Sequence, residues 1–331
     1  MRAIVCRGTG GVEVLALAEV ARPEPGPGEL LVRVGAAALN RADTLQRGGE
    51  YPPPPGESDI LGVEVAGEVA ACGPGVTGFA PGQRVFGLVP GGGYAEFCRM
   101  DAAQALPVPE GWSFAEAAAV PEAFLTAHIT LCELAGLRAG ESLLVHAGGS
   151  GVGTACIQMG RELGARVFCT AGSEEKIARA MELGAEAGVN HRTRDFAREI
   201  LRLTGGAGVD VVEDFLGAEA LERNLTVLRP GGRLLLVGVL TGTRCEVDLD
   251  PILLKRLRVL GTVLRGRPLE ERRTFTRHFR ERWLPRLAEG RLRPVIDSIH
   301  PWEQVARAHE AMEANRNFGK LILSLEGGSH A

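Results

Sequence analysis

From residue 142 onward, short apolar runs alternate with stretches in which apolar residues recur at helical spacing. The apolar runs predict strands at 142–146, 165–170, 187–191, 209–215, 233–239 and 258–264. The stretches between the first five of them predict amphipathic helices at 152–163, 174–183, 195–203 and 218–228. Strands and helices that alternate in this way form βαβ units, so this half of the chain is predicted to be an α/β domain with a parallel, doubly wound sheet.

The first hundred residues have a different pattern, with short β-branched runs separated by turns rich in proline and glycine. Strands are predicted at 2–6, 30–34, 63–70 and 84–89, and such short strands favour a β-barrel-like domain. Residues 114–135 become helical, with Pro121 marking a break and a hinge between domains. After the sixth strand of the second half, 268–288 and 302–314 look helical, and KLILSL (320–325) looks like a strand that returns to the first domain. We therefore expect a discontinuous first domain, 1–122 with 265–331, around a second domain at 123–264.

A glycine-rich segment, HAGGSGVGTA (146–155), follows the first strand of the alternating half and opens its first helix. This is the context that a dinucleotide-binding fingerprint requires, and the six strands match the Rossmann sheet. Gly151 and Gly153 supply the G-x-G, while the third small position falls on Cys156. Backbone N–H groups of 150–153 and the positive end of the helix are expected to hold a pyrophosphate. The alternative is a tight turn without a ligand.

The end of the second strand in this half indicates which dinucleotide binds. NAD-binding proteins place an acidic residue there to bond the ribose hydroxyls, whereas this chain has Ala171. Gly172, Ser173 and Lys176 are available to a 2′-phosphate, and Glu174 and Glu175 are expected to interact with the dipole of the next helix. The segment predicts NADPH rather than NADH.

Composition narrows the possible partners and the compartment. The net charge of −4 gives no reason to expect nucleic acid or an anionic membrane as a partner of the whole chain. The seven cysteines lie far apart with no C-x-x-C pair, which argues against a disulfide framework and a cysteine-rich zinc site. The sequence has no apolar stretch long enough for a signal peptide or a membrane span, so a cytoplasmic location is expected.

Several segments resemble the medium-chain dehydrogenase/reductase family over essentially the whole chain: ALNRADTLQRGGEYPPPPG, ILGVEVAGEV, PGQRVFG, the glycine segment, VDVVEDFLGAE and NFGKLIL. The zinc alcohol dehydrogenases of that family have a Cys where this chain has Asn40, and a His where it has Val63. Neither residue is a plausible zinc ligand, and the four-cysteine structural zinc lobe is missing too. The resemblance therefore implies a protein without bound metal.

The strings LNRAD, SGVGTA, TAGS and MEANRNFGK resemble the quinone oxidoreductase branch, in particular the tumour-suppressor-inducible quinone oxidoreductases. The resemblance implies a GroES-like β-barrel catalytic domain beside the Rossmann domain. It also implies zinc-independent hydride transfer from NADPH to a quinone in the interdomain cleft. A 2-enoyl thioester or enone reductase is the alternative enzyme. An NADPH-binding structural or RNA-binding protein of the zeta-crystallin type is the alternative of another class, because 265–293 is rich in arginine.

The resemblance also implies roles for individual residues. Asn40 and Thr126 would contact the nicotinamide half, and Ser173 and Lys176 the 2′-phosphate, with His191 standing where many relatives carry a tyrosine. Tyr51 could order the nicotinamide, donate a proton to the reduced quinone, or pack against the prolines that follow it; Asn40 and Tyr51 are thus the candidate catalytic residues. The other expected cofactor contacts are Ser150, Gly151, Val152, Gly153, Thr170, Gly172, Phe215, Gly238, Leu240, Leu264 and Lys320.

Three further polar residues have structural interpretations. Asp43 and Glu64 could act as general acid or base, but a buried ion pair or helix cap is favoured, and His146 is interpreted as a structural histidine. The sixth strand, RVLGTVL (258–264), would lie at the exposed edge of the nucleotide sheet, where an apolar edge invites pairing. We therefore expect a homodimer, or a tetramer built from it.

Overall fold

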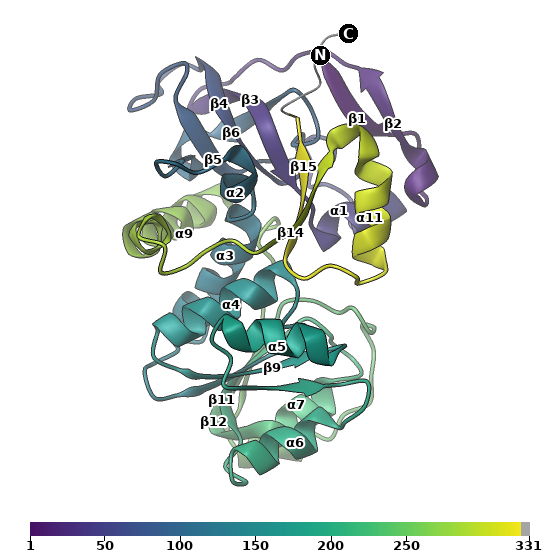
Figure 1. The fold of residues 1–331 in the computed structure, drawn as a ribbon, viewed down its shortest axis with the longest axis vertical. Coiled ribbons are helices and arrows are strands. Elements are labelled where there is room, and N and C mark those ends of the chain that lie inside the picture. Colours follow the sequence, from purple (N-terminus) through teal and green to yellow (C-terminus); the bar gives the residue numbers. More distant parts are fainter. Residues whose placement is uncertain (326–331) are drawn as a thin grey trace. The chain divides into compact units, whose positions relative to one another are not determined.

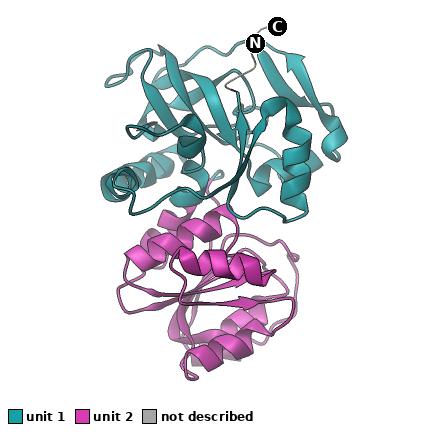
Figure 2. Ribbon diagram, viewed as in Figure 1, with its two compact units in different colours: residues 1–125, 265–331 teal, residues 126–264 magenta. Residues whose placement is uncertain are grey.

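A computed structural model describes residues 1–325 and divides the chain into two compact units. Unit 1 comprises residues 1–125 and the chain from 265 onward, and unit 2 comprises residues 126–264 (Figure 2). The first boundary lies between residues 125 and 126, three residues beyond the expected one at 122, and the second lies between residues 264 and 265. Among the described residues, none of the helices is long and apolar enough to cross a membrane.

Unit 2 is built on a parallel sheet of six strands in the order β10-β9-β8-β11-β12-β13. The strands are β8 (Ser142–Val145), β9 (Arg166–Ala171), β10 (Ala187–Asn190), β11 (Val209–Asp214), β12 (Leu228–Leu236) and β13 (Arg258–Gly261). The helices are α4 (Gly151–Glu162), α5 (Glu174–Glu182), α6 (Phe196–Leu203), α7 (Leu221–Val227) and α8 (Asp250–Leu254), preceded by the π-helical segment η3 (Ile129–Leu134). The strand order reverses between β8 and β11, so a ligand crevice is expected at their carboxyl ends. The doubly wound α/β fold is confirmed.

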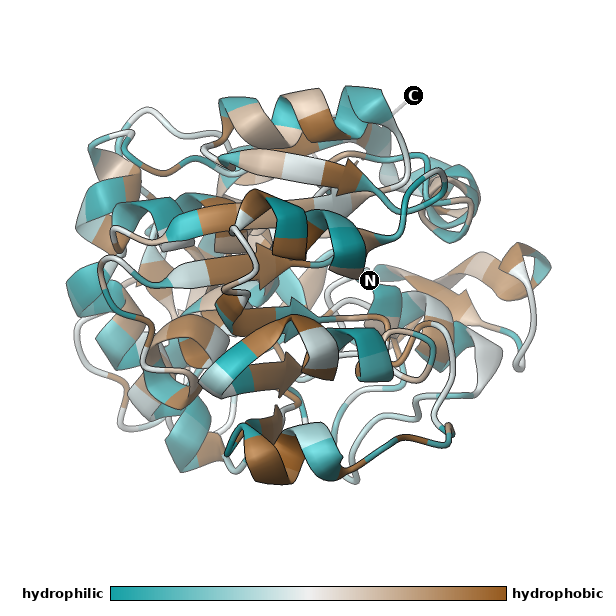
Figure 3. Ribbon diagram, turned by 90° about the horizontal axis from the view of Figure 1, so that it is seen from below, coloured by the Kyte–Doolittle hydropathy of each residue, from teal (hydrophilic) through white to brown (hydrophobic). Residues whose placement is uncertain are grey.

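Helices cover both faces of this sheet, α4 and α5 on one and α6 and α7 on the other (Figure 1). The strands are mostly hydrophobic, whereas hydrophilic and hydrophobic residues alternate along the helices (Figure 3). In α6, for example, Phe196, Ala197 and Ile200 are buried, while Arg198 lies on the outer face. A helix with one apolar stripe forms here because that stripe packs on the sheet.

Unit 1 contains the GroES-like sheet, in the order β14-β15-β3-β4-β5-β7, with β6 also paired to β3 and a separate β1–β2 ribbon. The strands are β1 (Arg2–Cys6), β2 (Leu15–Glu19), β3 (Glu29–Ala38), β4 (Glu64–Cys72), β5 (Arg84–Leu88), β6 (Phe97–Asp101), β7 (Leu106–Pro107), β14 (Ile296–Pro301) and β15 (Lys320–Ser324). β15 pairs antiparallel with β3, with Ile322 opposite Ala38. The expected return of KLILSL to the first domain is therefore confirmed.

The helices of unit 1 include the segments 268–288 and 302–314 that the sequence predicted to be helical. They are α1 (Arg41–Gly48), α2 (Phe114–Ala118), α9 (Leu269–Arg282), α10 (Leu284–Ala288) and α11 (Val305–Glu313), with short 3₁₀ segments η1 (Val12–Val14), η2 (Ala102–Gln104) and η4 (Trp302–Gln304). The predicted break at Pro121 is the first residue of α3 (Pro121–His128), which runs across the boundary between the units. Pro is well placed there, because the first N–H of a helix has no partner within it.

Candidate functional site

The glycine loop of unit 2 connects β8 to α4, with Ser150 as the N-cap of the helix. The Ser150 hydroxyl accepts the Gly153 N–H at 2.9 Å, and the Ser150 N–H donates to the Ala147 carbonyl at 2.8 Å. Two of the four amides expected to hold a pyrophosphate are therefore used inside the loop. The amides of Gly151 and Val152, at the positive end of α4, are the two that a phosphate could receive.

Close backbone approach explains why glycine is needed in this loop. A Cβ on Gly153 would lie 2.3 Å from the Ala147 carbonyl oxygen, and one on Gly148 would lie 2.9 Å from the Cys169 Cβ. The tight packing of helix against strand falls one turn beyond Cys156, at Gly160, where a Cβ would lie 2.8 Å from a Leu143 methyl group. The loop thus has the form of a phosphate cradle, with Gly160 taking the packing role expected at position 156.

The expected 2′-phosphate site lies at the ends of β9 and β10. β9 ends at the buried Ala171, and the His191 N–H donates to the Ala171 carbonyl at 3.1 Å. Ser173 is the N-cap of α5 and its hydroxyl accepts the Lys176 N–H at 3.2 Å. Burial, together with the charge of Arg192, lowers the pKa of His191, which favours a neutral imidazole at pH 7. No carboxylate stands at the strand end.

Arg192 is a residue at this strand end that the sequence interpretation missed. Its guanidinium Nε lies 3.2 Å from the position that a Cβ on Gly172 would occupy, so the side chain crosses the glycine directly after β9. Its position after His191 was the available signal, because β10 is the neighbour of β9 in a doubly wound sheet. A guanidinium here adds a positive charge where the 2′-phosphate is expected.

The other expected cofactor residues of unit 2 lie at or beyond the carboxyl ends of its strands. Phe215 follows β11, and its carbonyl accepts the Leu240 N–H at 3.1 Å and lies 3.0 Å from a Cβ placed on Gly238. Leu264 comes after β13. The Thr170 hydroxyl is within 2.9 Å of His146 Nδ1, and the other ring nitrogen of His146 is 2.7 Å from Asn224 Oδ1. His146 is therefore a hydrogen-bonded core residue, and burial lowers its pKa to about 4.

Thr126 is the first residue of unit 2, within α3, and its side chain is buried. Its carbonyl accepts the Thr130 hydroxyl at 3.0 Å. Its contact with the nicotinamide stays a prediction.

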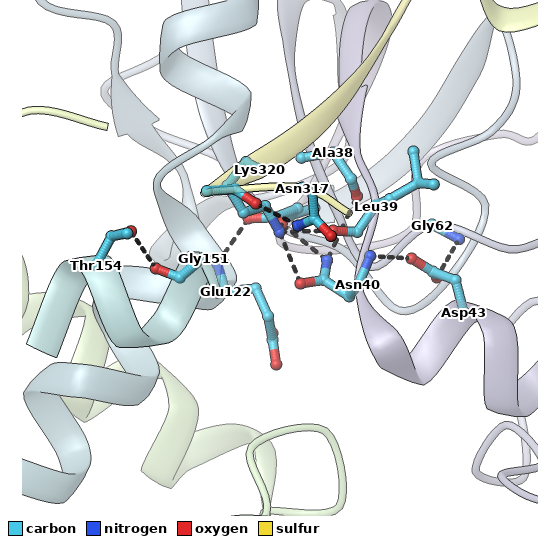
Figure 4. Close-up of polar contacts among 12 residues, drawn as sticks. Ala38, Leu39, Asn40, Asp43, Gly62, Glu122, Gly151, Thr154, Asn317 and Lys320 are labelled. Atoms are coloured by element: carbon cyan, nitrogen blue, oxygen red, sulfur yellow. Dashed lines mark hydrogen bonds and ion pairs between the residues drawn. The ribbon is translucent and has the colours of Figure 1, made fainter. Parts of the chain in front are cut away.

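Unit 1 holds a buried polar cluster of Asn40, Glu64 and Lys320, called here the Lys320 cluster (Figure 4). The Lys320 ammonium donates to Glu64 Oε1 at 2.6 Å, to Asn40 Oδ1 at 2.8 Å and to the Leu39 carbonyl at 2.7 Å. The Asn40 amide nitrogen donates to the same Glu64 oxygen at 2.8 Å. The three ammonium donors of Lys320 are thus used inside unit 1. Its expected contact with the cofactor stays a prediction.

Asp43 caps α1 from beside the Lys320 cluster. It accepts the Asn40 N–H at 2.8 Å, the Gly62 N–H at 3.1 Å and the Tyr94 hydroxyl at 3.2 Å. Burial raises the pKa of Asp43 to about 6, against the lowering effect of its N–H donors. Asp43 and Glu64 are therefore a cap and a buried ion pair, the structural interpretation favoured from the sequence.

Glu122, at the start of α3, was not singled out from the sequence either. Its N–H donates to Glu64 Oε2 at 2.7 Å, while its own half-buried carboxyl points away from Asn40 and Lys320 (Figure 4). Burial, followed by the nearby Glu64 carboxylate, raises the pKa of Glu122 to about 8. The partly buried Tyr51 phenol also has a raised pKa, through burial and then the charge of Glu122. Tyr51 and Glu122 therefore lie close enough for the charge of one to affect the pKa of the other.

Comparison with known families matches the two halves of the chain separately. Residues 26–128 match the family described as Alcohol dehydrogenase GroES-like domain, and residues 151–280 match that described as Zinc-binding dehydrogenase. Quinone oxidoreductase of Rattus norvegicus is 35% identical over 330 residues, which cover 98% of this chain and 98% of that protein.

Solved structures share the fold along nearly the whole chain. One described as NAD-dependent alcohol dehydrogenase is 37% identical, with a TM-score of 0.88, covering 98% of this chain and 100% of that chain. Escherichia coli quinone oxidoreductase complexed with NADPH is 30% identical, with a TM-score of 0.88 and the same coverage. The CurK enoyl reductase is 28% identical, with a TM-score of 0.86, covering 98% of both chains.

The residues of unit 1 do not fit a catalytic zinc ion at Asn40 and Val63, the positions where the family resemblance implies zinc ligands in the zinc alcohol dehydrogenases. Asn40 offers an amide whose oxygen and nitrogen both bond inside the Lys320 cluster, and the apolar side chain of Val63 is buried. The Glu64 carboxylate already binds an ammonium 2.6 Å away. A zinc ion needs several unpaired thiolate, imidazole or carboxylate donors, and this set does not supply them.

Removing the ammonium of Lys320 should strongly destabilise unit 1, because it leaves the Glu64 carboxylate buried and unpaired. Lys320→Met is expected to lower the free energy of unfolding by about 3–5 kcal/mol. Adding Glu64→Gln to the same protein should recover part of that loss, since the buried charge is then gone. Urea denaturation followed by circular dichroism measures both effects.

The control is the exposed ion pair between Arg33 and Glu68. Arg33→Met should cost less than about 1 kcal/mol, because water screens that pair. Equal unfolding midpoints for Lys320→Met and Arg33→Met would contradict the importance of the buried pair.

Proposed function

Because the chain belongs to the medium-chain dehydrogenase/reductase family, we propose that it is a zinc-independent, NADPH-dependent quinone oxidoreductase. The observation that carries the proposal is the Lys320 cluster. Its ammonium donates to the side-chain oxygens of Asn40 and Glu64, in the region where the zinc relatives hold their metal. Without a Lewis acid, alkoxide formation lacks its usual stabilisation. Quinones suit such a site because they take up a hydride without activation by a metal.

The residues of unit 2 fit a dinucleotide phosphate, and the nicotinamide ring supplies a hydride when it is bound. We propose that the Gly151 and Val152 amides hold the pyrophosphate, and that Ser173, Lys176 and Arg192 hold the 2′-phosphate. Asn40 and Thr126 are proposed to contact the nicotinamide half. Catalysis then rests mainly on proximity and orientation, which fix the acceptor against the hydride.

A second enzyme function is supported by the likeness to the CurK enoyl reductase. An enone or 2-enoyl thioester is, like a quinone, an acceptor that a neighbouring carbonyl has already activated. A test panel must therefore contain both acceptor types.

The non-enzymatic, RNA-binding alternative has less support from the arginine-rich segment. Arg273 pairs with Asp101, Arg265 bonds Glu57 at 2.7 Å, and Arg280 donates to the Ala105 carbonyl at 2.8 Å. These arginines are bonded to partners within unit 1 and are therefore less available to phosphates of a nucleic acid.

We propose that the protein acts in the cytoplasm. Its seven cysteines are free thiols in the structure, which agrees with a reducing compartment.

The activity itself is tested by mixing purified protein and NADPH with several ortho- and para-quinones, an enone and a 2-enoyl thioester. Oxidation of NADPH, followed by its loss of absorbance, is expected with the quinones, and to a lesser extent with the enone. Adding a zinc chelator should leave the rate unchanged. A sample that oxidises no NADPH with any quinone would exclude the proposed function, while turnover of the thioester alone would favour the second candidate.

The cofactor preference is tested by titrating NADPH and NADH into the protein and following nucleotide fluorescence. Charge-assisted contacts contribute about 1.5–3 kcal/mol each, so NADPH should bind more than tenfold tighter than NADH. Ala171→Asp should reverse or erase the preference by placing an anion against the phosphate. Lys176→Ala and Arg192→Ala should each weaken NADPH about tenfold and leave NADH little changed.

Arg194→Ala is the matched control, because Arg194 is exposed in the same loop but does not lie over Gly172. It should keep the preference of the unmutated protein. Equal affinity of the unmutated protein for the two nucleotides would show that the strand end does not recognise a 2′-phosphate.

We also propose a homodimer, or a tetramer built from it, formed through the edge of the nucleotide sheet. β13 is an edge strand of the sheet, and Val259 on it and Val263 just after it are 43% and 55% exposed. Leu253 and Leu254 of α8, which precedes β13 in sequence, are 74% and 72% exposed. Such an uncovered apolar edge favours pairing with a second copy. Light scattering at micromolar concentration should give a dimer or larger mass, and Val259→Lys with Leu253→Lys should give a monomer.

Ile299→Lys is the control for the dimer. Ile299 is 53% exposed on β14, the edge strand of the sheet in unit 1. This change should leave the mass unaltered, and a monomeric unmutated protein would refute the proposed assembly.

A further inference from the structure

The carboxyl of Glu122 is placed unlike those of the other acids in its neighbourhood. Glu122 is the second residue of α3, where a carboxylate would normally be stabilised by the positive end of the helix. Asp43 and Glu64 accept N–H, O–H or ammonium donors, whereas among the described residues no donor reaches the Glu122 carboxyl. The Glu122 carboxyl is therefore accessible and is not held by a hydrogen bond to another described residue.

The two oxygens of Glu64 fix where the backbone of Glu122 lies. Oε1 accepts the Asn40 side-chain amide at 2.8 Å, and Oε2 accepts the Glu122 backbone N–H at 2.7 Å. Asn40 and Glu122 are thereby attached to opposite sides of one buried carboxylate. If Asn40 contacts the nicotinamide half, as proposed, then the start of α3 lies beside that end of the cofactor, and the Glu122 carboxyl extends from it on the side away from Asn40 (Figure 4).

The charges around Glu122 come from several elements of unit 1 and favour its protonated form on balance. Burial and the Glu64 carboxylate raise its pKa most, Asp43 raises it further, and the cations Lys320 and Arg265 lower it. With a pKa of about 8, the group is mainly a neutral acid at pH 7 and loses its proton as pH rises through 8.

The proposed reaction needs such an acid. A quinone that accepts a hydride becomes a hydroquinone monoanion, and an enone becomes an enolate; each must then take up one proton. We propose that the Glu122 carboxyl donates this proton to the reduced acceptor and is reprotonated by water, an inference that rests on the proposed oxidoreductase function. The hydride carries both electrons. The reaction is therefore balanced by one hydride from the cofactor and one proton from Glu122.

Tyr51 is the competing donor, because proton donation to the reduced quinone is one of the roles that the sequence analysis left open for it. Its pKa is raised above the usual value for tyrosine by burial and by the charge of Glu122. A phenol in that environment gives up a proton less readily than a carboxylic acid. This difference in acidity favours Glu122 over Tyr51 as the proton donor and leaves Tyr51 to order the acceptor or the nicotinamide.

The test measures kcat from about pH 6 to about pH 10 with a para-quinone and an enone, together with the affinity for NADPH. In the unmutated protein kcat should fall above about pH 8. Glu122→Gln should lower kcat about 100-fold, abolish the fall at alkaline pH and leave NADPH affinity unchanged. Glu122→Asp should keep the alkaline fall at reduced kcat. A ¹³C nuclear magnetic resonance titration of the glutamates, without any cofactor, should contain two carboxyls that titrate near pH 8, because burial also raises the pKa of Glu213 to about 8. Glu122→Gln should remove one of the two and leave the other.

Two further variants make the result decisive. Glu110→Gln changes an exposed glutamate of the same unit and should leave both kcat and its pH profile unaltered. If Glu122→Gln keeps the rate and the alkaline fall, or if Tyr51→Phe is the change that removes the fall, the inference is overturned while the oxidoreductase function stands. Absence of turnover by the unmutated protein with every acceptor would remove the function and this inference together.

Discussion

One buried ion pair, between Lys320 of β15 and Glu64 of β4, joins two strands of the unit 1 sheet whose paired residues lie 256 positions apart in sequence. Burying two charges costs several kcal/mol for each ion, and this cost is offset only when the remaining donors and acceptors are bonded. Here the ammonium also bonds Asn40 and Leu39, and the carboxylate also bonds the Glu122 backbone. The pair therefore holds β15, β4 and the starts of α1 and α3 in one arrangement.

The same ion pair limits the chemistry that unit 1 supports. An ammonium can stabilise a carboxylate and orient an amide, but it does not leave an open coordination position for an alcohol or carbonyl oxygen. Of the three acids described in this region, Asp43 and Glu64 are bonded, and only the Glu122 carboxyl accepts no hydrogen bond from the described residues. Acceptors that are already activated suit such a site, and quinones and enones share that property.

Unit 2 depends on a constraint of distance. Gly153 lies so close to the Ala147 carbonyl that any side chain would displace either the loop or α4. The same closeness brings the first amides of the helix to the carboxyl end of β8, where the strand order reverses. At the neighbouring strand end, Gly172 leaves the space that the Arg192 side chain crosses. Glycine thus shapes both proposed phosphate sites, in one case through backbone contact and in the other through an arginine.

The sequence alone determined the α/β sheet, the return of β15 to the first unit and the glycine loop that opens α4. Each of these depends on local periodicity and on the short-range chemistry of glycine. It also indicated, through Ala171, that no carboxylate ends β9. The tertiary structure decided that Lys320 bonds Glu64, that Arg192 lies over Gly172, and that Glu122 shares the Glu64 carboxylate with Asn40. Most of these contacts join residues distant in sequence, and burial then alters their charges, so no local pattern could have indicated them.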